Sequence, residues 1–164
     1  MSKADLSQDF FELGDRTSIV CADPVTTELV RGSLKDLGFK IHFVDSSDEA
    51  LERIRYSQYH CIVIHENFAG SILKTNAVMQ YLASLPMALR RGSFVCLIGD
   101  SFNTLDAMQA FAQSVNVVMN PADLPNLTAI LKKSLAEFEM MYRVYRIAVD
   151  SQGDRRAPSR RTDR

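Results

Sequence analysis

Five short runs of apolar, mostly β-branched residues recur along the chain of 164 residues, and each is bounded by polar or turn-forming residues. Such runs predict strands. They lie at Ser18–Cys21, Lys40–Val44, Cys61–Ile64, Phe94–Ile98 and Val115–Met119. Because the runs are almost continuously apolar, the strands are expected to be buried on both faces.

Helical patterns occupy the segments between these runs. Pro24–Leu37 carries apolar residues at three- and four-residue steps and stops at Gly38, a residue favoured just after helix ends. Cap-type and acidic residues at 46–49 begin a second helix that should reach about Tyr56. Two more helices are expected: one from about Leu73 to Leu89, which Pro86 must kink or interrupt, and one from about Thr104 to Gln113, with Leu105, Met108 and Phe111 facing inward.

Strand and helix patterns therefore alternate along the whole chain. This alternation predicts a parallel sheet with helices on both faces. Because crossover connections between parallel strands are right-handed, the pattern favours a doubly wound α/β fold of the flavodoxin-like kind.

The last helical pattern is unusually long. It runs from about Leu124 to Val149 with no glycine or proline after Pro125, which is roughly 25 residues or about 38 Å of helix. An apolar stripe follows it past the expected edge of the domain, at Leu131, Leu135, Phe138, Tyr142, Tyr145 and Val149. The first half of this stripe should join the core, while the second half is a dimer seam, a seam for a partner helix, or one side of a stiff spacer. We favour self-association, with Leu135, Phe138, Tyr142, Tyr145 and Val149 as the interface candidates.

Composition narrows the range of partners. The formal net charge is −1 and the chain has no tryptophan, so neither a basic field nor an aromatic-basic surface marks a nucleic-acid-binding protein. No run approaches the ~20 apolar residues that cross a bilayer, and the first residues do not form a secretory signal. We expect a cytoplasmic protein with neither nucleic acid nor membrane as its main partner.

The cysteines give no sign of a disulfide framework. Cys21, Cys61 and Cys96 are an odd number, widely spaced, and each lies in an apolar run. They are expected to be reduced thiols in the core.

With the elements in place, the residues from about Thr17 to Glu137 resemble the receiver domain of bacterial response regulators. The marks are Asp23-Pro24 after the first strand, Leu37-Gly38-Phe39 after the first helix, the Ser-Ser-Asp-Glu-Ala-Leu run at 46–51, the segment Tyr59–Gly70 around the third strand, and Asn120-Pro121 followed by Asp123-Leu124 after the fifth. The resemblance implies a five-stranded sheet in the order 2-1-3-4-5, here with an extended C-terminal helix.

In phosphorylated receivers an aspartate ends the third strand, an acidic pair follows the first, a hydroxyl residue follows the fourth and a lysine follows the fifth. The carboxylate attacks phosphorus while Mg²⁺ and the ammonium neutralise the developing charge. Aligned on this pattern, the chain has His65 for the aspartate, Cys21 and Ala22 for the acidic pair with Asp23 beside them, Ile98 for the hydroxyl residue and Asn120 for the lysine. The resemblance therefore predicts a degenerate phosphoacceptor pocket without catalytic residues, in a pseudo-receiver.

Other interpretations of this pocket remain open. His65 could cap the strand end by hydrogen bonding, could itself be phosphorylated, or could join Cys21, Asp23 and Asp100 in a metal site, although no closely spaced ligand pair is present. A redox role for Cys21 would need an exposed thiol with a lowered pKa. The loop after the first strand has no glycine for a phosphate-binding turn, so no cofactor and no metal are predicted.

The sequence divides into four parts. They are an N-terminal extension (1–16), the pseudo-receiver domain (17–137), the extension of the final helix (138–150) and a basic tail (151–164), which is expected to be disordered alone. In the tail, Arg156 and Arg160 resemble the opening arginine motif of PilZ domains, which clamp the phosphates of cyclic-di-GMP, although the remainder of such a domain is absent.

The predicted function is a phosphorylation-independent signalling or adaptor module of the response-regulator type, not an enzyme, that binds a protein partner or a second copy of itself. The alternative is a small-molecule or metal sensor that uses the remodelled pocket, with a link to cyclic-di-GMP signalling.

Overall fold

Five parallel strands form one sheet at the centre of the molecule. The computed structural model describes residues 11–154, in which the sheet has the order β2-β1-β3-β4-β5. The strands are β1 (Thr17–Cys21), β2 (Lys40–Val44), β3 (Cys61–His65), β4 (Phe94–Ile98) and β5 (Val117–Met119). The doubly wound α/β fold predicted from the sequence is confirmed, including its strand order.

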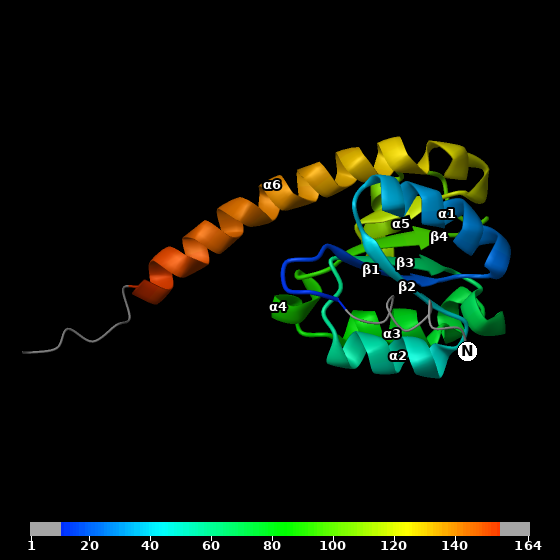
Figure 1. The fold of residues 1–164 in the computed structure, drawn as a ribbon, viewed down its shortest axis with the longest axis horizontal. Coiled ribbons are helices and arrows are strands. Elements are labelled where there is room, and N and C mark those ends of the chain that lie inside the picture. Colours follow the sequence, from blue (N-terminus) through cyan, green and yellow to red (C-terminus); the bar gives the residue numbers. More distant parts are fainter. Residues whose placement is uncertain (1–10, 155–164) are drawn as a thin grey trace, which may run out of the picture.

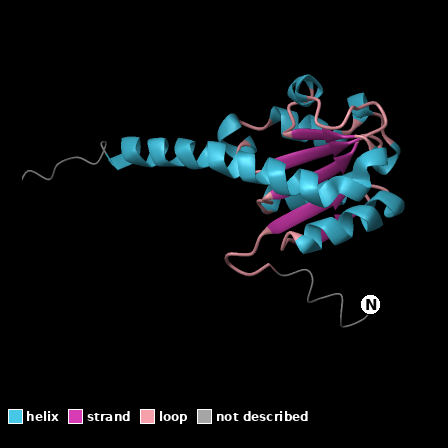
Figure 2. Ribbon diagram, turned by 90° about the horizontal axis from the view of Figure 1, so that it is seen from above, coloured by secondary structure: helices cyan, strands magenta, loops and turns pink. Residues whose placement is uncertain are grey.

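Helices cover both faces of this sheet (Figures 1 and 2). On one face lie α1 (Pro24–Asp36) and the first part of α6 (Leu127–Asp154), whose buried residues pack on Val20, Val63 and Cys96. The other face is covered by α2 (Ser47–Tyr56) and α3 (Ala77–Ser84), with Ala110 of α5 (Ala107–Ala112). The sheet therefore separates two apolar layers. In each layer, side chains of the sheet and of the covering helices pack together and are buried from water.

The expected third helix is divided into three pieces. These are the 3-10 helix η3 (Leu73–Thr75), α3 and the short α4 (Met87–Arg90). Asn76 caps α3 by accepting hydrogen bonds from the N–H groups of Val78 (3.1 Å) and Met79 (3.2 Å). The second break falls at Leu85-Pro86, where the sequence predicted an interruption.

The prediction for the fourth helix is wrong in its start and in its buried face. Leu105, Met108 and Phe111 are exposed, by 53%, 73% and 80%, while Ala110 is buried. The cause is the turn before α5: Leu105 has a left-handed φ of 65°, and Asp106 caps the helix. The helix begins three residues later than expected, so Leu105 lies before it, and Met108 and Phe111 lie on its outer side.

The final helix is the longest element. The segment 121–126 forms the 3-10 helix η4 (Pro121–Asn126), and α6 follows for 28 residues. Figure 1 shows that α6 runs beside α1 on one side of the sheet and then continues beyond the rest of the domain. Among the helices of residues 11–154, none combines the length and the apolar character needed to cross a membrane, α6 included.

Candidate functional site

The carboxyl ends of the strands bring the residues of the predicted degenerate phosphoacceptor pocket to one edge of the sheet, which we call the phosphoacceptor edge. Cys21, His65 and Ile98 are the last residues of β1, β3 and β4, and Asn120 directly follows β5. Cys21 and Ile98 are fully buried, in the layers under α2–α3 and under α1–α6 respectively. Ala22 is also buried, so the polar groups of this edge come from Asp23, His65 and Asn120 and from residues that the resemblance did not mark.

Asp23 is the N-cap of α1. Its carboxylate accepts hydrogen bonds from the backbone N–H of Thr26 (3.1 Å) and from the Thr26 hydroxyl (2.6 Å). Partial burial acts to raise the pKa of Asp23, but the two bonds from Thr26 and the neighbouring His65 outweigh it, so the pKa lies below its ordinary value. This carboxylate is therefore charged at neutral pH, and it caps the amino-terminal end of α1.

His65 is held by the loop that follows it. Its Nδ1 accepts a hydrogen bond from the backbone N–H of Asn67 (3.1 Å), and its side chain is half-buried. The geometry is that of a side chain capping a strand end, which was one of the interpretations left open by the sequence. Because Nδ1 accepts a bond, the ring proton of neutral His65 is on Nε2.

Glu66 directly follows His65 and was not among the predicted pocket residues, since it would take the phosphoacceptor position only in an alignment shifted by one residue. Only 5% of it is exposed, and the hydroxyl of Ser101 donates to its Oε2 (2.9 Å) and also lies 3.2 Å from its Oε1. The backbone N–H of Ser101 is 3.4 Å from the same Oε1. A carboxylate next to the phosphoacceptor position is thus already bonded to a hydroxyl from the loop after β4.

Gly99 makes room for this contact. A Cβ at position 99 would lie 2.3 Å from the carboxyl carbon of Glu66, well inside the van der Waals limit. The sequence signal was present, since a glycine follows β4 and a hydroxyl residue comes two positions later. However, the partner of both lies more than thirty positions away in the chain.

Asn120 joins the same loops from the β5 side. Its amide nitrogen donates to the carbonyl oxygens of Phe102 (3.1 Å) and Asp100 (3.4 Å), while its Oδ1 accepts the N–H of Ala122 (3.0 Å). Thr104 accepts the N–H of Asn120 (2.9 Å) and donates its hydroxyl to Asp123. Hydrogen bonds therefore connect the end of β3, the loop before α5 and the start of η4.

The thiols are not available to this edge. All three cysteines are fully buried. Desolvation raises the pKa of Cys61 to about 12 and raises those of Cys21 and Cys96 as well. Within residues 11–154, no group of three or more His, Cys, Asp or Glu side chains could hold a metal ion.

The second candidate site is the far half of α6. Leu135 and Phe138 are buried in the core of the domain, where Phe138 packs edge-on against Phe94 at 5.5 Å. Tyr142 is half-buried against the same core, whereas Tyr145 and Val149 are 44% and 47% exposed. Of the predicted interface residues, only Tyr145 and Val149 are thus exposed.

A further apolar set lies on α6 that the sequence analysis did not single out. We call it the outer stripe, and it consists of Met140, Met141, Val144 and Ile147, with 72%, 59%, 69% and 62% exposure. Arg156 and Arg160, the predicted phosphate-binding residues of the tail, lie outside the described residues.

Comparisons with known proteins agree with this geometry. No protein-family model and no curated protein matches the chain. Among solved structures, a CheY-like receiver domain from Methylobacillus flagellatus is 22% identical, with a TM-score of 0.54 over 73% of this chain and 98% of that one. A response regulator from Thermotoga maritima has 13% identity and a TM-score of 0.56, covering 74% and 98%.

A receiver protein from Burkholderia phymatum has 16% identity and a TM-score of 0.55, covering 74% of this chain and 96% of its own. These identities are low, but all three TM-scores are above 0.5. The chain therefore has the fold of response-regulator receiver domains.

Proposed function

We propose that this chain is a signalling module of the response-regulator type that works without phosphorylation and without catalysis, by binding proteins and a second copy of itself. The observation that carries the first part is the chemistry at the end of β3. An imidazole stands there, and the neighbouring carboxylate of Glu66 is buried and bonded to Ser101. A carboxylate that is shielded in this way is a poor nucleophile for a phosphodonor.

The loop after β4, which a phosphoryl group would reorganise, is also already fixed by hydrogen bonds. Glu66, Ser101, Thr104 and Asn120 connect the β3, β4 and β5 ends through the hydrogen bonds described above. A ligand can shift an equilibrium only if it binds two states differently. A permanent carboxylate–hydroxyl contact supports a module that stays in one state.

Self-association is supported by the outer stripe. At about 100° per residue, Glu139, Arg143, Arg146 and Asp150 fall within an arc of roughly 60°, and the apolar residues occupy most of the remaining circumference. Leaving such a helix in water is unfavourable by roughly 25 cal/mol per Å² of apolar surface. Tyr142 is half-buried, and Tyr145 and Val149 are less exposed than any residue of the outer stripe, so the outer stripe is the stronger candidate for the contact with a second copy.

One sedimentation experiment tests both parts. The wild-type chain should sediment as a dimer at micromolar concentration, and a small phosphodonor with Mg²⁺ should leave both its sedimentation and its intact mass unchanged. The double variant Val144→Glu/Ile147→Glu should be monomeric, because it places two charges in the apolar seam. Lys132→Glu is the matched control, since Lys132 is exposed on the polar side of the same helix and its substitution changes the net charge by the same amount.

Two results would contradict these proposals separately. A stable phosphoryl adduct on the intact protein would refute phosphorylation independence. A wild-type monomer, or equal effects of the double variant and Lys132→Glu, would refute association through the outer stripe.

A further inference from the structure

A pocket of about 380 Å³ lies where α6 leaves the domain, at the amino ends of the strands and far from the phosphoacceptor edge. We call it the basal pocket. Its walls come from the segment before β3, from α4 and the turn before β4, and from one turn of α6. The lining residues are Gln58, His60, Ala88, Arg91, Gly92, Tyr142, Tyr145 and Arg146. Its size falls in the range of small-ligand sites.

The charged side chains that line this pocket are all positive. Arg91 and Arg146 line it together, and no carboxylate is among its lining residues, although the net charge of the chain is −1. Within residues 11–154 neither guanidinium has an ion-pair partner. Two like charges that share a pocket repel each other, and an anion between them would relieve that repulsion.

Arg91 is oriented by an aromatic ring. Its guanidinium carbon lies 4.9 Å from the centroid of the Tyr145 ring, on its face. Stacking of this kind uses the face of the guanidinium and leaves the N–H groups at its edge free to donate. The planar fork of an arginine suits the oxygens of a phosphate group.

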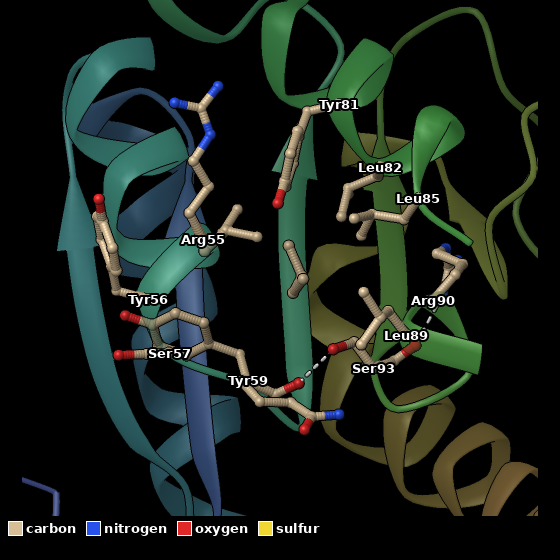
Figure 3. Close-up of a pocket in the computed structure, with 13 residues that line it drawn as sticks. Arg55, Tyr56, Ser57, Tyr59, Tyr81, Leu82, Leu85, Leu89, Arg90 and Ser93 are labelled. Atoms are coloured by element: carbon tan, nitrogen blue, oxygen red, sulfur yellow. Dashed lines mark hydrogen bonds between the residues drawn. The ribbon is translucent and has the colours of Figure 1, made fainter. Parts of the chain in front are cut away.

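The adjacent arginine provides a contrast. Arg90 also contributes to a pocket, the smaller one of about 170 Å³ between α2 and α3 shown in Figure 3. However, its N–H groups donate to the carbonyl oxygens of Ser93 (2.8 Å) and Ser114 (2.9 Å) and to Asn116 (3.2 Å). Arg90 is therefore a structural arginine, while the guanidinium of Arg91 makes no hydrogen bond to another described residue.

His60 adds a third donor. Its Nδ1 accepts the backbone N–H of Thr17 (3.1 Å), so the proton of the neutral ring is on Nε2. With the amide of Gln58 and the hydroxyl groups of the two tyrosines, the polar lining consists of groups that can donate hydrogen bonds.

We propose that the basal pocket binds a small phosphate-bearing ligand between Arg91 and Arg146. Because Arg91 belongs to the domain and Arg146 to α6, the bound ligand would tie the helix extension to the domain. This proposal does not rest on self-association or on the chemistry of the phosphoacceptor edge.

Isothermal titration calorimetry in about 150 mM NaCl, where non-specific attraction is screened, tests it. Three probes separate the sources of phosphate: inorganic phosphate, pyrophosphate and ATP. At least one of them should bind saturably with a stoichiometry of one per chain. Arg91→Gln and Arg146→Gln should each weaken that binding about tenfold or more, since each removes charge-assisted hydrogen bonds.

Arg143→Gln is the matched control, because Arg143 is exposed on the same helix but does not line the pocket. It should leave binding unchanged within about twofold. Far-ultraviolet circular dichroism confirms that each variant is folded, and Arg146→Gln alone still tests the site if Arg91→Gln unfolds. Absence of saturable binding by all three probes would overturn the proposal, as would an equal loss in Arg143→Gln.

Discussion

At the scale of single residues, the contact between Glu66 and Ser101 decides what the phosphoacceptor edge can do. A buried carboxylate without hydrogen bonds would be costly, and here one hydroxyl lies within bonding distance of both of its oxygens. Gly99 is the third member of this contact, because any larger residue would occupy the place of the carboxyl group. The edge is therefore filled by the side chains of the chain itself.

The substitution Gly99→Ala tests this packing. It should destabilise the fold by about 1–3 kcal/mol, because the new methyl group must displace Glu66 from Ser101. In a Glu66→Ala background the same substitution should cost less, which gives a coupling energy of at least about 0.5 kcal/mol in a double-mutant cycle. Urea unfolding measures each free energy.

Gly32→Ala is the control for this cycle. Gly32 lies within α1, and a Cβ there would meet nothing within 4 Å. The substitution should stabilise the fold by about 0.5–1 kcal/mol, as expected for a helix interior. Additive effects of Gly99→Ala and Glu66→Ala would show that the two residues do not share this space.

At the scale of elements, the strands were predictable and the short helix α5 was not. Strands buried on both faces are read as continuous apolar runs, and the five predicted runs correspond to the five strands within two residues. β5 begins at Val117, because Asn116 uses its side-chain Oδ1 to accept the N–H of Val95 (2.8 Å). For α5, the spacing of Leu105, Met108 and Phe111 indicated a buried face, but the turn at Leu105 rotated them outward.

The contacts at the strand ends could be predicted only in part. The positions of His65, Asp23 and Asn120 followed from the order of strands, because the carboxyl ends of parallel strands meet at one edge. The bond between Glu66 and Ser101 joins loops that are distant in sequence and depends on side-chain orientation. No local pattern encodes such a contact.

The cap of α1 gives a prediction about pH. Asp23→Ala should lower the free energy of unfolding by about 0.5–2 kcal/mol at neutral pH, since the N–H of Thr26 loses its acceptor. The folded-state pKa of Asp23 is lowered, so the stabilisation by its charge is present above the unfolded value of 3.8 and is lost as pH falls through the folded value. The difference between wild type and variant should therefore narrow below about pH 4.

Ser46→Ala is the comparison for this measurement. Ser46 caps α2 with a hydroxyl that accepts the N–H of Glu49 (3.2 Å), and a hydroxyl does not titrate in this range. Its cost should stay constant between pH 3 and 7. If the gap for Asp23→Ala were equally constant, the charge of Asp23 would not contribute to the cap.

At the scale of the whole molecule, two apolar layers enclose the thiols on opposite sides of the sheet. Cys21 lies in the layer under α2 and α3, and Cys61 and Cys96 lie in the layer under α1 and α6. All three have raised pKa values, that of Cys61 to about 12, so few thiolates form at neutral pH. Reaction of any of them requires the domain to open.

Thiol labelling should therefore report global unfolding. In the native protein all three cysteines should react slowly and at a common rate with a disulfide reagent, and that rate should rise with urea in parallel with unfolding. Mass spectrometry of the labelled peptides distinguishes the three sites. Rapid native labelling or peroxide oxidation at Cys21 alone would instead support a redox role for this residue.

The uninterrupted course of α6 from the edge of the domain to residue 154 fixes the direction in which its outer stripe points. Each inserted residue after Phe138 would turn the following side chains by about 100° and move them by about 1.5 Å, whereas seven inserted residues would restore their bearing to within about 20°. The far half of this helix therefore presents the outer stripe at a fixed angle about the helix axis relative to the sheet. An insertion or deletion within it would rotate the outer stripe about that axis.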